Sequence, residues 1–127
     1  MDERIEKIIN DSDTSALATS GPNGINVVPV SVFEARGGEV IVYNFFMQKT
    51  EENLASETRV AFSCWKGFVG VQLKADVVVE YAGPDFDEAV IVMKERFPER
   101  TLKSLIKLTP VEIYDIAPGV DTKKPIL

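Results

Sequence analysis

One segment of the chain joins an apolar strand to a short helix with almost no connection between them. Residues 39–46, EVIVYNFF, carry the β-branched and aromatic side chains that strands favour. Lys49 and Thr50 follow, and Thr50 with the two glutamates after it suits the N-cap and first turn of a helix. The fold must therefore place the end of this strand beside the start of a helix.

The start of this helix is a candidate phosphate site. Amides left unpaired in its first turn, with the Lys49 ammonium beside them, favour a bound anion. Residues 44–47 add backbone polar groups and flat apolar surface, so a ligand with a phosphate tail and a planar head, such as flavin mononucleotide (FMN), fits the combination. Many strands end in the same pattern without binding anything, and Glu51 and Glu52 would repel a phosphate that came close. This motif alone leaves both interpretations open.

Length and charge narrow the classes of function. The 127 residues suit a single domain, residues 1–127, with one core and one site. The 45% apolar and 27% charged residues are typical of a globular protein. A formal net charge of −6 opposes the phosphate attraction on which nucleic-acid binders depend, so we expect no nucleic-acid partner.

The chain contains no histidine and one cysteine, Cys64. The chain therefore lacks the usual general base of Ser and Cys hydrolases and the commonest ligand of transition-metal sites. We therefore expect no metal site. Cys64 cannot form an internal disulfide, and its apolar surroundings in the sequence indicate a small buried side chain.

No membrane or secretory segment is predicted. The N-terminal MDERIEKIIND mixes charges with isoleucines and lacks the apolar core of a signal peptide. No other stretch reaches the roughly 18 apolar residues that span a bilayer. We expect a cytoplasmic protein without a membrane partner.

The pattern of strands and turns predicts a mainly β fold with flanking helices. The expected strands are residues 15–19, 25–33, 39–46, 59–65, 68–81 and 111–116. The expected helices start at Asp2, at Thr50 and at Asp87, with a further helical turn or two in residues 101–107. Residues 34–38 are expected to form a turn.

Six strands with a helix between the third and fourth favour a six-stranded antiparallel split β-barrel, Greek-key-like, with short helices covering its ends. A dinucleotide fold is excluded because no G-x-G-x-x-G follows a predicted strand. Pro29 lies in the middle of the second strand, where its missing amide donor would break a ladder. An edge strand or a strand facing a ligand would each accommodate it.

Four motifs, in order and spacing, carry a resemblance that covers most of the chain: TSALAT at 14–19, VPVS at 28–31, QKTEENL at 48–54 and TRV at 58–60. With them the chain resembles the FMN-binding split-barrel family, which includes the pyridoxamine 5′-phosphate oxidases and small bacterial FMN-binding proteins. The resemblance implies FMN as cofactor and a homodimer with flavin at the subunit interface. The positions that match the family's cofactor site are Val28, Pro29, Val30, Ser31, Asn44, Phe45, Phe46, Met47, Lys49, Thr50 and Asn53.

In the family, the region matching Lys49 and Thr50 binds the FMN phosphate, and the position of Asn53 often supports it. The segments matching residues 28–31 and 44–47 lie along the flavin. A second copy would complete each site, and Trp65 and Leu127 are its candidate contributions. No catalytic acid or base is marked, although Tyr43 and Ser31 are possible hydrogen-bond donors.

The chain departs from the true oxidases at its C-terminus. Their Arg- and His-rich motif that grips the substrate is replaced here by DTKKPIL, which argues against vitamin B6 oxidation. The short FMN-binding members are the better match, and they imply an oxidoreductase, either flavin reductase-like or passing electrons. A storage or redox-sensing module without turnover, and an F420-binding reductase, remain alternatives. Haem would lack its common axial ligands.

Overall fold

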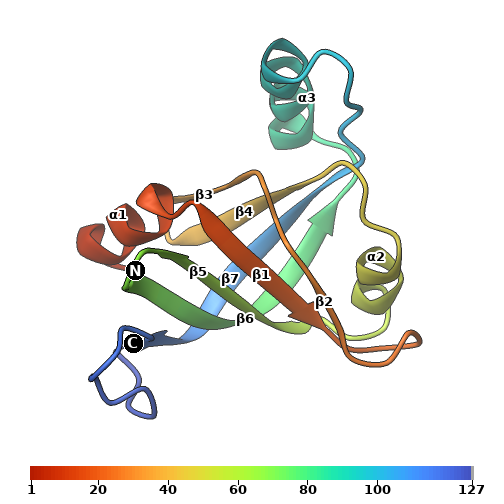
Figure 1. Ribbon diagram of the computed structural model, residues 1–127. Coiled ribbons are helices and arrows are strands. Elements are labelled where there is room, and N and C mark those ends of the chain that lie inside the picture. Colours follow the sequence, from red (N-terminus) through yellow and green to blue (C-terminus); the bar gives the residue numbers. More distant parts are fainter. Residues whose placement is uncertain (127) are drawn as a thin grey trace.

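The structure is a computed structural model that describes residues 1–126. These residues form one curled antiparallel sheet in the order β2-β1-β5-β6-β7-β4-β3, with three helices at its margins (Figure 1). The strands are β1 (Thr14–Thr19), β2 (Asn26–Val28), β3 (Phe33–Arg36), β4 (Glu39–Asn44), β5 (Arg59–Lys66), β6 (Val69–Glu80) and β7 (Ser104–Asp115). The helices are α1 (Glu3–Asp11), α2 (Lys49–Leu54) and α3 (Pro84–Arg96). The mainly β, split-barrel class predicted from the sequence is confirmed.

The main core lies inside the curl of the sheet. Alternate residues of β5 point inward, so that Val60, Phe62 and Cys64 are buried while their neighbours are not. The ring of Phe62 meets that of Phe33 edge-on, with centroids 5.3 Å apart. Helix α1 packs against the same core through Ile5 and Ile9. Cys64 is buried and free, as its sequence context indicated.

The sheet has seven strands within the described residues, one more than predicted. The expected strand over residues 25–33 stops at Val28, because Pro29 has no amide to donate, and pairing resumes only at Phe33. The expected turn over residues 34–38 is wrong except for Gly37 and Gly38, which connect β3 to β4 with φ of 60° and 81°. Two consecutive residues at positive φ make the tight hairpin that glycine allows.

The last strand is also longer than predicted. Residues 101–107 were expected to contain helical turns, but β7 begins at Ser104 and pairs with β4 on one side and β6 on the other. Leu105, Ile106 and Leu108 are buried by this pairing, which outweighs local helix propensity. Pro110 is tolerated within β7 because it lies opposite a register shift in β6, between Lys74 and Ala75.

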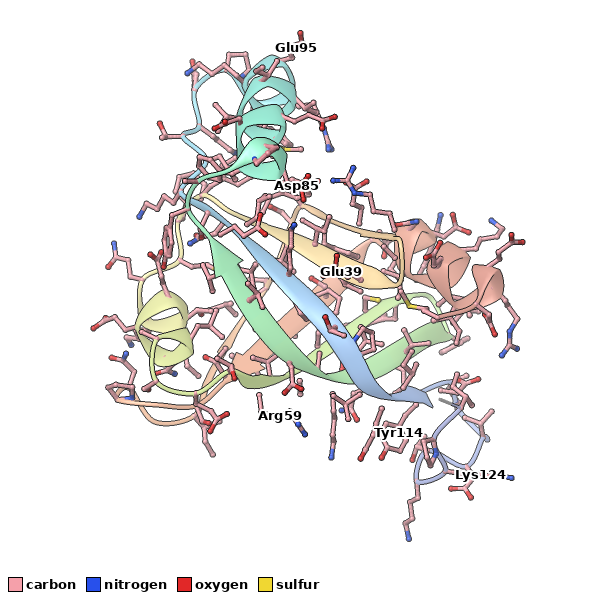
Figure 2. The ribbon with its side chains drawn as sticks, turned by 180° about the vertical axis from the view of Figure 1, so that it is seen from behind. Glu39, Arg59, Asp85, Glu95, Tyr114 and Lys124 are labelled. Atoms are coloured by element: carbon pink, nitrogen blue, oxygen red, sulfur yellow. The ribbon has the colours of Figure 1, made fainter. Side chains whose placement is uncertain are left out.

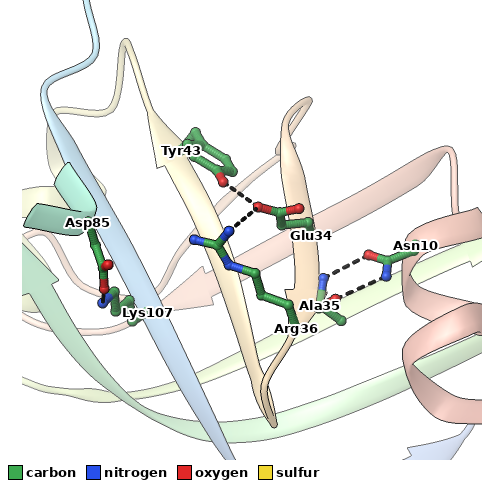
Figure 3. Close-up of polar contacts among 7 residues, drawn as sticks. All are labelled: Asn10, Glu34, Ala35, Arg36, Tyr43, Asp85 and Lys107. Atoms are coloured by element: carbon green, nitrogen blue, oxygen red, sulfur yellow. Dashed lines mark hydrogen bonds and ion pairs between the residues drawn. The ribbon is translucent and has the colours of Figure 1, made fainter. Parts of the chain in front are cut away.

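Helix α3 stands at the edge of the barrel and covers a second, smaller core (Figure 1). Figure 2 shows this helix from behind, with Asp85 near its base and Glu95 toward its outer end. Its first turn is tied to the sheet by Lys107, whose ammonium lies 2.6 Å from Asp85 Oδ2 and 3.0 Å from Glu80 Oε2 (Figure 3). Among residues 1–126, no helix combines the length and apolar character needed to cross a bilayer.

Candidate functional site

A cavity of about 480 Å³ lies between the segment that links β2 to β3 and the segment that links β4 to α2. In Figure 1 the first segment is the orange-brown stretch that rises from β2 to β3, and the second is the yellow stretch that runs from β4 into α2. Its lining residues are Asn26, Val28, Pro29, Val30, Ser31, Tyr43, Phe45, Phe46, Met47, Gln48, Lys49 and Thr50. The break in the edge strand at Pro29 therefore forms one wall of the cavity, and the strand-to-helix connection forms the other.

The walls of the cavity are mainly apolar, and Arg100 and Phe97 pack against their aromatic residues. Val30 and Phe45 are buried, whereas the ring of Phe46 is 70% exposed. The guanidinium of Arg100 lies 5.4 Å from the Phe45 ring centroid and 5.7 Å from that of Phe46. It also lies 4.3 Å from the ring of Phe97, which meets Phe45 edge-on. Cation–π contacts of this kind stabilise the aromatic wall.

Tyr43 is among the residues that line the cavity, and its hydroxyl is engaged by Glu34. The hydroxyl donates to Glu34 Oε1 at 2.6 Å, and Arg36 Nη1 lies 3.8 Å from the same oxygen (Figure 3). Burial and then the hydrogen bond to Glu34 raise the pKa of Tyr43 well above its usual range. Tyr43 and Ser31 were the two hydrogen-bond donors suggested by the sequence. The Tyr43 hydroxyl already donates to Glu34, whereas Ser31 is exposed and lines the cavity.

One end of the cavity is polar and positively charged. Lys49 is exposed there and is the charged side chain among the described residues that line the cavity. Thr50 beside it is only 1% exposed, and its Oγ1 accepts a hydrogen bond from Asn26 Nδ2 at 3.1 Å. That geometry leaves the Thr50 proton available to donate.

Thr50 is not the N-cap of α2, and that prediction was wrong. The helix begins at Lys49, and Gln48 occupies the cap position without a side-chain hydrogen bond. The Thr50 hydroxyl is instead used across the fold, toward Asn26 of β2. A tertiary partner has replaced the local cap that the sequence suggested.

The acidic side chains of α2 point away from the cavity. Glu51 and Glu52 line a separate hollow, on the side of the helix that carries Ala55 and faces Tyr81 and Lys103. The Glu51 carboxylate accepts from Asn44 Nδ2 at 2.9 Å and from the Tyr81 hydroxyl at 3.0 Å. The repulsion expected between these glutamates and a phosphate is therefore directed away from the Lys49 end of the cavity.

Asn44 is one of two predicted site residues that lie behind the cavity and do not line it. Its side chain is fully buried at the end of β4, where Oδ1 accepts from the Met47 amide at 2.9 Å. Its Nδ2 donates to Ser104 Oγ at 3.0 Å as well as to Glu51. Asn44 thus shapes the connection that forms the cavity wall.

Asn53 is the second predicted site residue that lies behind the cavity, and its side chain is fully buried like that of Asn44. Its Nδ2 donates to Thr19 Oγ1 and to the Gly24 carbonyl, and its Oδ1 accepts from the Asn23 amide at 3.0 Å. A Cβ built on Gly21 would lie 2.8 Å from this Oδ1, so the turn between β1 and β2 approaches α2 too closely for a side chain there. Asn53 therefore fastens that turn to the helix.

The two remaining predicted residues lie elsewhere. Trp65 lies on β5 and lines a different hollow, with Gly67, Phe68 and Pro118 among its neighbours. Leu127 is outside the described residues. Conversely, Asn26 and Gln48 line the cavity although neither was predicted to; Gln48 directly precedes Lys49, and that adjacency was the available signal.

The arrangement suits a ligand with a flat apolar body and an anionic end. Within residues 1–126, no three His, Cys, Asp or Glu side chains gather in a way that could hold a metal ion. Lys49 and Thr50 supply a cation and a hydroxyl at one end, and aromatic and aliphatic side chains supply the rest. Such a lining, mostly apolar with a few convergent polar groups, is typical of small-molecule sites.

Comparison with protein families gives one match, to the family described as pyridoxamine 5′-phosphate oxidase, over residues 1–117. No curated protein matches the sequence.

Several solved structures share the fold. HupZ of Group A Streptococcus superposes with a TM-score of 0.81 at 14% identity, over 95% of this chain and 98% of that chain. An FMN-binding protein from Syntrophomonas wolfei gives 0.77 at 21% identity, over 91% and 85%. A structure described as an F420 reductase gives 0.67 at 15% identity, over 89% and 98%. At these identities the likeness establishes the fold.

Proposed function

The chain belongs to the pyridoxamine 5′-phosphate oxidase family, and from that premise we propose that it binds FMN noncovalently and passes electrons or a hydride between a reduced donor and an acceptor. The observation that carries the proposal is the cavity with apolar walls and the Lys49–Thr50 pair at one end. Its volume of about 480 Å³ falls within the roughly 300–1,000 Å³ of cofactor and ligand sites.

The lining residues fit the chemistry of FMN. Lys49 would neutralise the phosphate, and the Thr50 hydroxyl, whose acceptor capacity is used by Asn26, would donate to it. Residues 28–31 and Phe45–Met47 would hold the ring system between them. Bound flavin would supply the electron-transfer chemistry, and the protein would position it, shield it and tune its surroundings.

The substrate is proposed to differ from that of the oxidases that give the family its description. The 127 residues contain no histidine, the residue type that the resemblance associates with the grip on pyridoxamine phosphate. The cavity lining likewise contains no arginine among the described residues. We therefore propose a flavin reductase-like or electron-transfer protein.

We also propose that the protein is a homodimer with flavin at the interface. The outer face of β2, β1 and β5 is small and uncharged where Val27, Ala18 and Ala61 lie side by side. Val27 is 60% exposed, and Ile25 just before β2 is 86% exposed. An uncharged, flat surface next to the cavity suits the core of an interface between identical copies. Trp65 and Leu127 would come from the partner.

The absorption spectrum of freshly purified protein, with mass spectrometry of any released pigment, tests the cofactor. We expect the bands of oxidised flavin and the mass of FMN. The mass of F420 would favour the alternative suggested by the F420 reductase of similar fold. A colourless protein that fails to take up added FMN would contradict the proposal and favour an interaction domain that has kept the barrel alone.

Turnover separates the enzyme from a flavin-storage or redox-sensing module. Flavin that is reduced by NADH or NADPH and reoxidised by an added acceptor would support the oxidoreductase. Flavin that no donor reduces would support the module.

A further inference from the structure

Glu51 is the point at which α2 is attached to the strands behind the cavity. Its Oε2 accepts from Asn44 Nδ2 at the end of β4, and its Oε1 accepts from the hydroxyl of Tyr81, the residue after β6. Asn44 also donates to Ser104 Oγ at the start of β7. One carboxylate thus links the helix to three strand ends.

Of the two partners of Glu51, Asn44 is itself held in place by the fold. Asn44 and Ser104 are fully buried, and the Asn44 side chain uses both amide hydrogens and its oxygen within this network. The Asn44 side chain can therefore present its second hydrogen to Glu51 in only one direction. Hydrogen bonds to an ionised carboxylate are stronger than bonds between neutral groups.

Helix α2 depends on such contacts for its orientation. It has six residues and no side-chain cap, and isolated helices of that length are not stable in water. Asn53 secures its C-terminal half to the turn between β1 and β2. The first half, which carries Lys49 and Thr50, is secured by Glu51 and by the hydrogen bond from Asn26 to Thr50 Oγ1.

We propose that Glu51 is a positioning residue that holds Lys49 and Thr50 at the mouth of the cavity, in the orientation that receives the phosphate of the cofactor. The inference rests on the proposed function for the identity of the ligand, and on the hydrogen bonds of Glu51 for the orientation. Charge repulsion alone would make the Glu51 carboxylate unfavourable for phosphate binding. The positioning role makes it favourable.

Glu52 is a matched control for this role. It neighbours Glu51 on the same helix and carries the same charge, but it is exposed and no hydrogen bond of its carboxylate is found among the described residues. If charge alone mattered, Glu51→Gln and Glu52→Gln would both tighten FMN binding by removing a negative charge. Positioning by Glu51 predicts that Glu51→Gln weakens FMN binding and that Glu52→Gln does not.

The first experiment measures FMN and riboflavin affinity by fluorescence quenching for the wild type and both variants. We expect Glu51→Gln to bind FMN about tenfold more weakly, because the neutral glutamine loses both charge-assisted bonds and offers one acceptor oxygen in place of two. Riboflavin, which has no phosphate, should bind both variants and the wild type alike. Glu52→Gln should bind FMN as tightly as the wild type or more tightly.

Equal effects of the two changes on FMN affinity would overturn the proposal. So would a parallel loss of riboflavin affinity in Glu51→Gln, which would indicate general damage to the fold. Tyr81→Phe removes one donor and keeps the ring, so it should shift FMN affinity in the same direction as Glu51→Gln.

A second measurement does not need a cofactor. In flavin-free protein, hydrogen exchange at the Ala55 amide, which donates to the Glu51 carbonyl at 3.2 Å, reports the opening of α2. We expect faster exchange in Glu51→Gln than in Glu52→Gln, and equal exchange would refute the attachment itself. If the wild type binds neither flavin and the two variants still differ in exchange, the proposed function is refuted and the attachment of α2 by Glu51 is retained.

Discussion

Lys49 and Thr50 are adjacent, yet the fold places them in different environments. The Lys49 side chain is exposed and free to meet a ligand, whereas Thr50 is buried against Asn26. Lys49 therefore provides charge and Thr50 provides a directed hydroxyl. At the scale of single residues, the phosphate assignment depends mainly on Lys49.

Replacing Lys49 with alanine should weaken FMN binding by about 1.5 kcal/mol, the lower end for a hydrogen bond to a charged group, because the side chain is exposed to solvent. Fluorescence titration with FMN and with riboflavin measures the effect, and riboflavin affinity should not change. Lys103→Ala, on the other side of α2, is the control. Unchanged FMN affinity in a folded Lys49→Ala protein would remove Lys49 from the site.

Asn53 is expected to act on stability first. Asn53→Ala leaves the Asn23 amide, the Gly24 carbonyl and Thr19 without their partner, which should cost about 2 kcal/mol of unfolding free energy. Urea denaturation measures this cost. Asn23→Ala removes only an exposed side chain with 3.4 Å contacts, and its effect should stay below about 0.5 kcal/mol. Similar costs for both variants would contradict the buried role of Asn53.

At the scale of elements, α3 matters because it supports the cavity from outside. Its core cluster includes Tyr43 and Phe45, two residues that line the cavity, and the connection that follows it supplies Phe97 and Arg100. Lys107 of β7 holds the first turn of the helix through Asp85, and Glu80 at the end of β6 contacts the same ammonium. Loosening α3 should therefore loosen the aromatic wall.

The Lys107–Asp85 pair should make the attachment of α3 sensitive to acid. The hydrogen bond from Lys107 lowers the pKa of Asp85 below its ordinary value near 4, and the same bond, with that to Glu80, raises the pKa of Lys107. A depressed carboxyl pKa contributes stability above the unfolded-state pKa, and that contribution is lost as the pH falls through the folded-state pKa.

The comparison of wild type with Lys107→Met in urea, from pH 6 down to pH 2, measures this contribution. The wild type should lose more stability below about pH 4 than the variant, which has no charge on residue 107 to hold Asp85 ionised. Lys66→Met, an exposed lysine at the end of β5, should retain the wild-type pH dependence. Parallel acid profiles for wild type and Lys107→Met would contradict this role.

At the scale of the whole molecule, the sheet is curled with its two edge strands, β2 and β3, on either side of the break at Pro29. The cavity opens along that break and is walled by one chain only in part. The outer face of β2, β1 and β5, which is uncharged at Val27, Ala18 and Ala61, continues beside it. A second copy seated on this face would cover both features.

Ala18→Arg places a charge in the middle of that face, so the proposed dimer should dissociate and FMN binding should weaken by tenfold or more. Sedimentation velocity with FMN titration measures both. Val78→Arg, at an exposed site on β6 away from this face, should leave both unchanged. A monomeric wild type that still binds FMN would refute the shared site.

Patterns among neighbouring residues were enough to predict much of the fold and part of the candidate site. The alternation of β1, β5 and β6, the Gly37–Gly38 turn residues and the adjacency of strand and helix around Lys49 are features of neighbouring residues, which is why they could be predicted. The missing histidine and the four motifs also belong to the sequence alone, and the family match agrees with them.

Tertiary structure decided what depends on residues far apart in the chain. Residues 104–107 form a strand because β4 and β6 supply backbone hydrogen-bond partners. The Thr50 hydroxyl bonds to Asn26, 24 residues away, and does not cap α2. Asn44 and Ser104, 60 residues apart, together turn Glu51 away from the cavity. Local propensity amounts to a few tenths of a kcal/mol per residue, so buried pairing and hydrogen bonding overrode it at these positions.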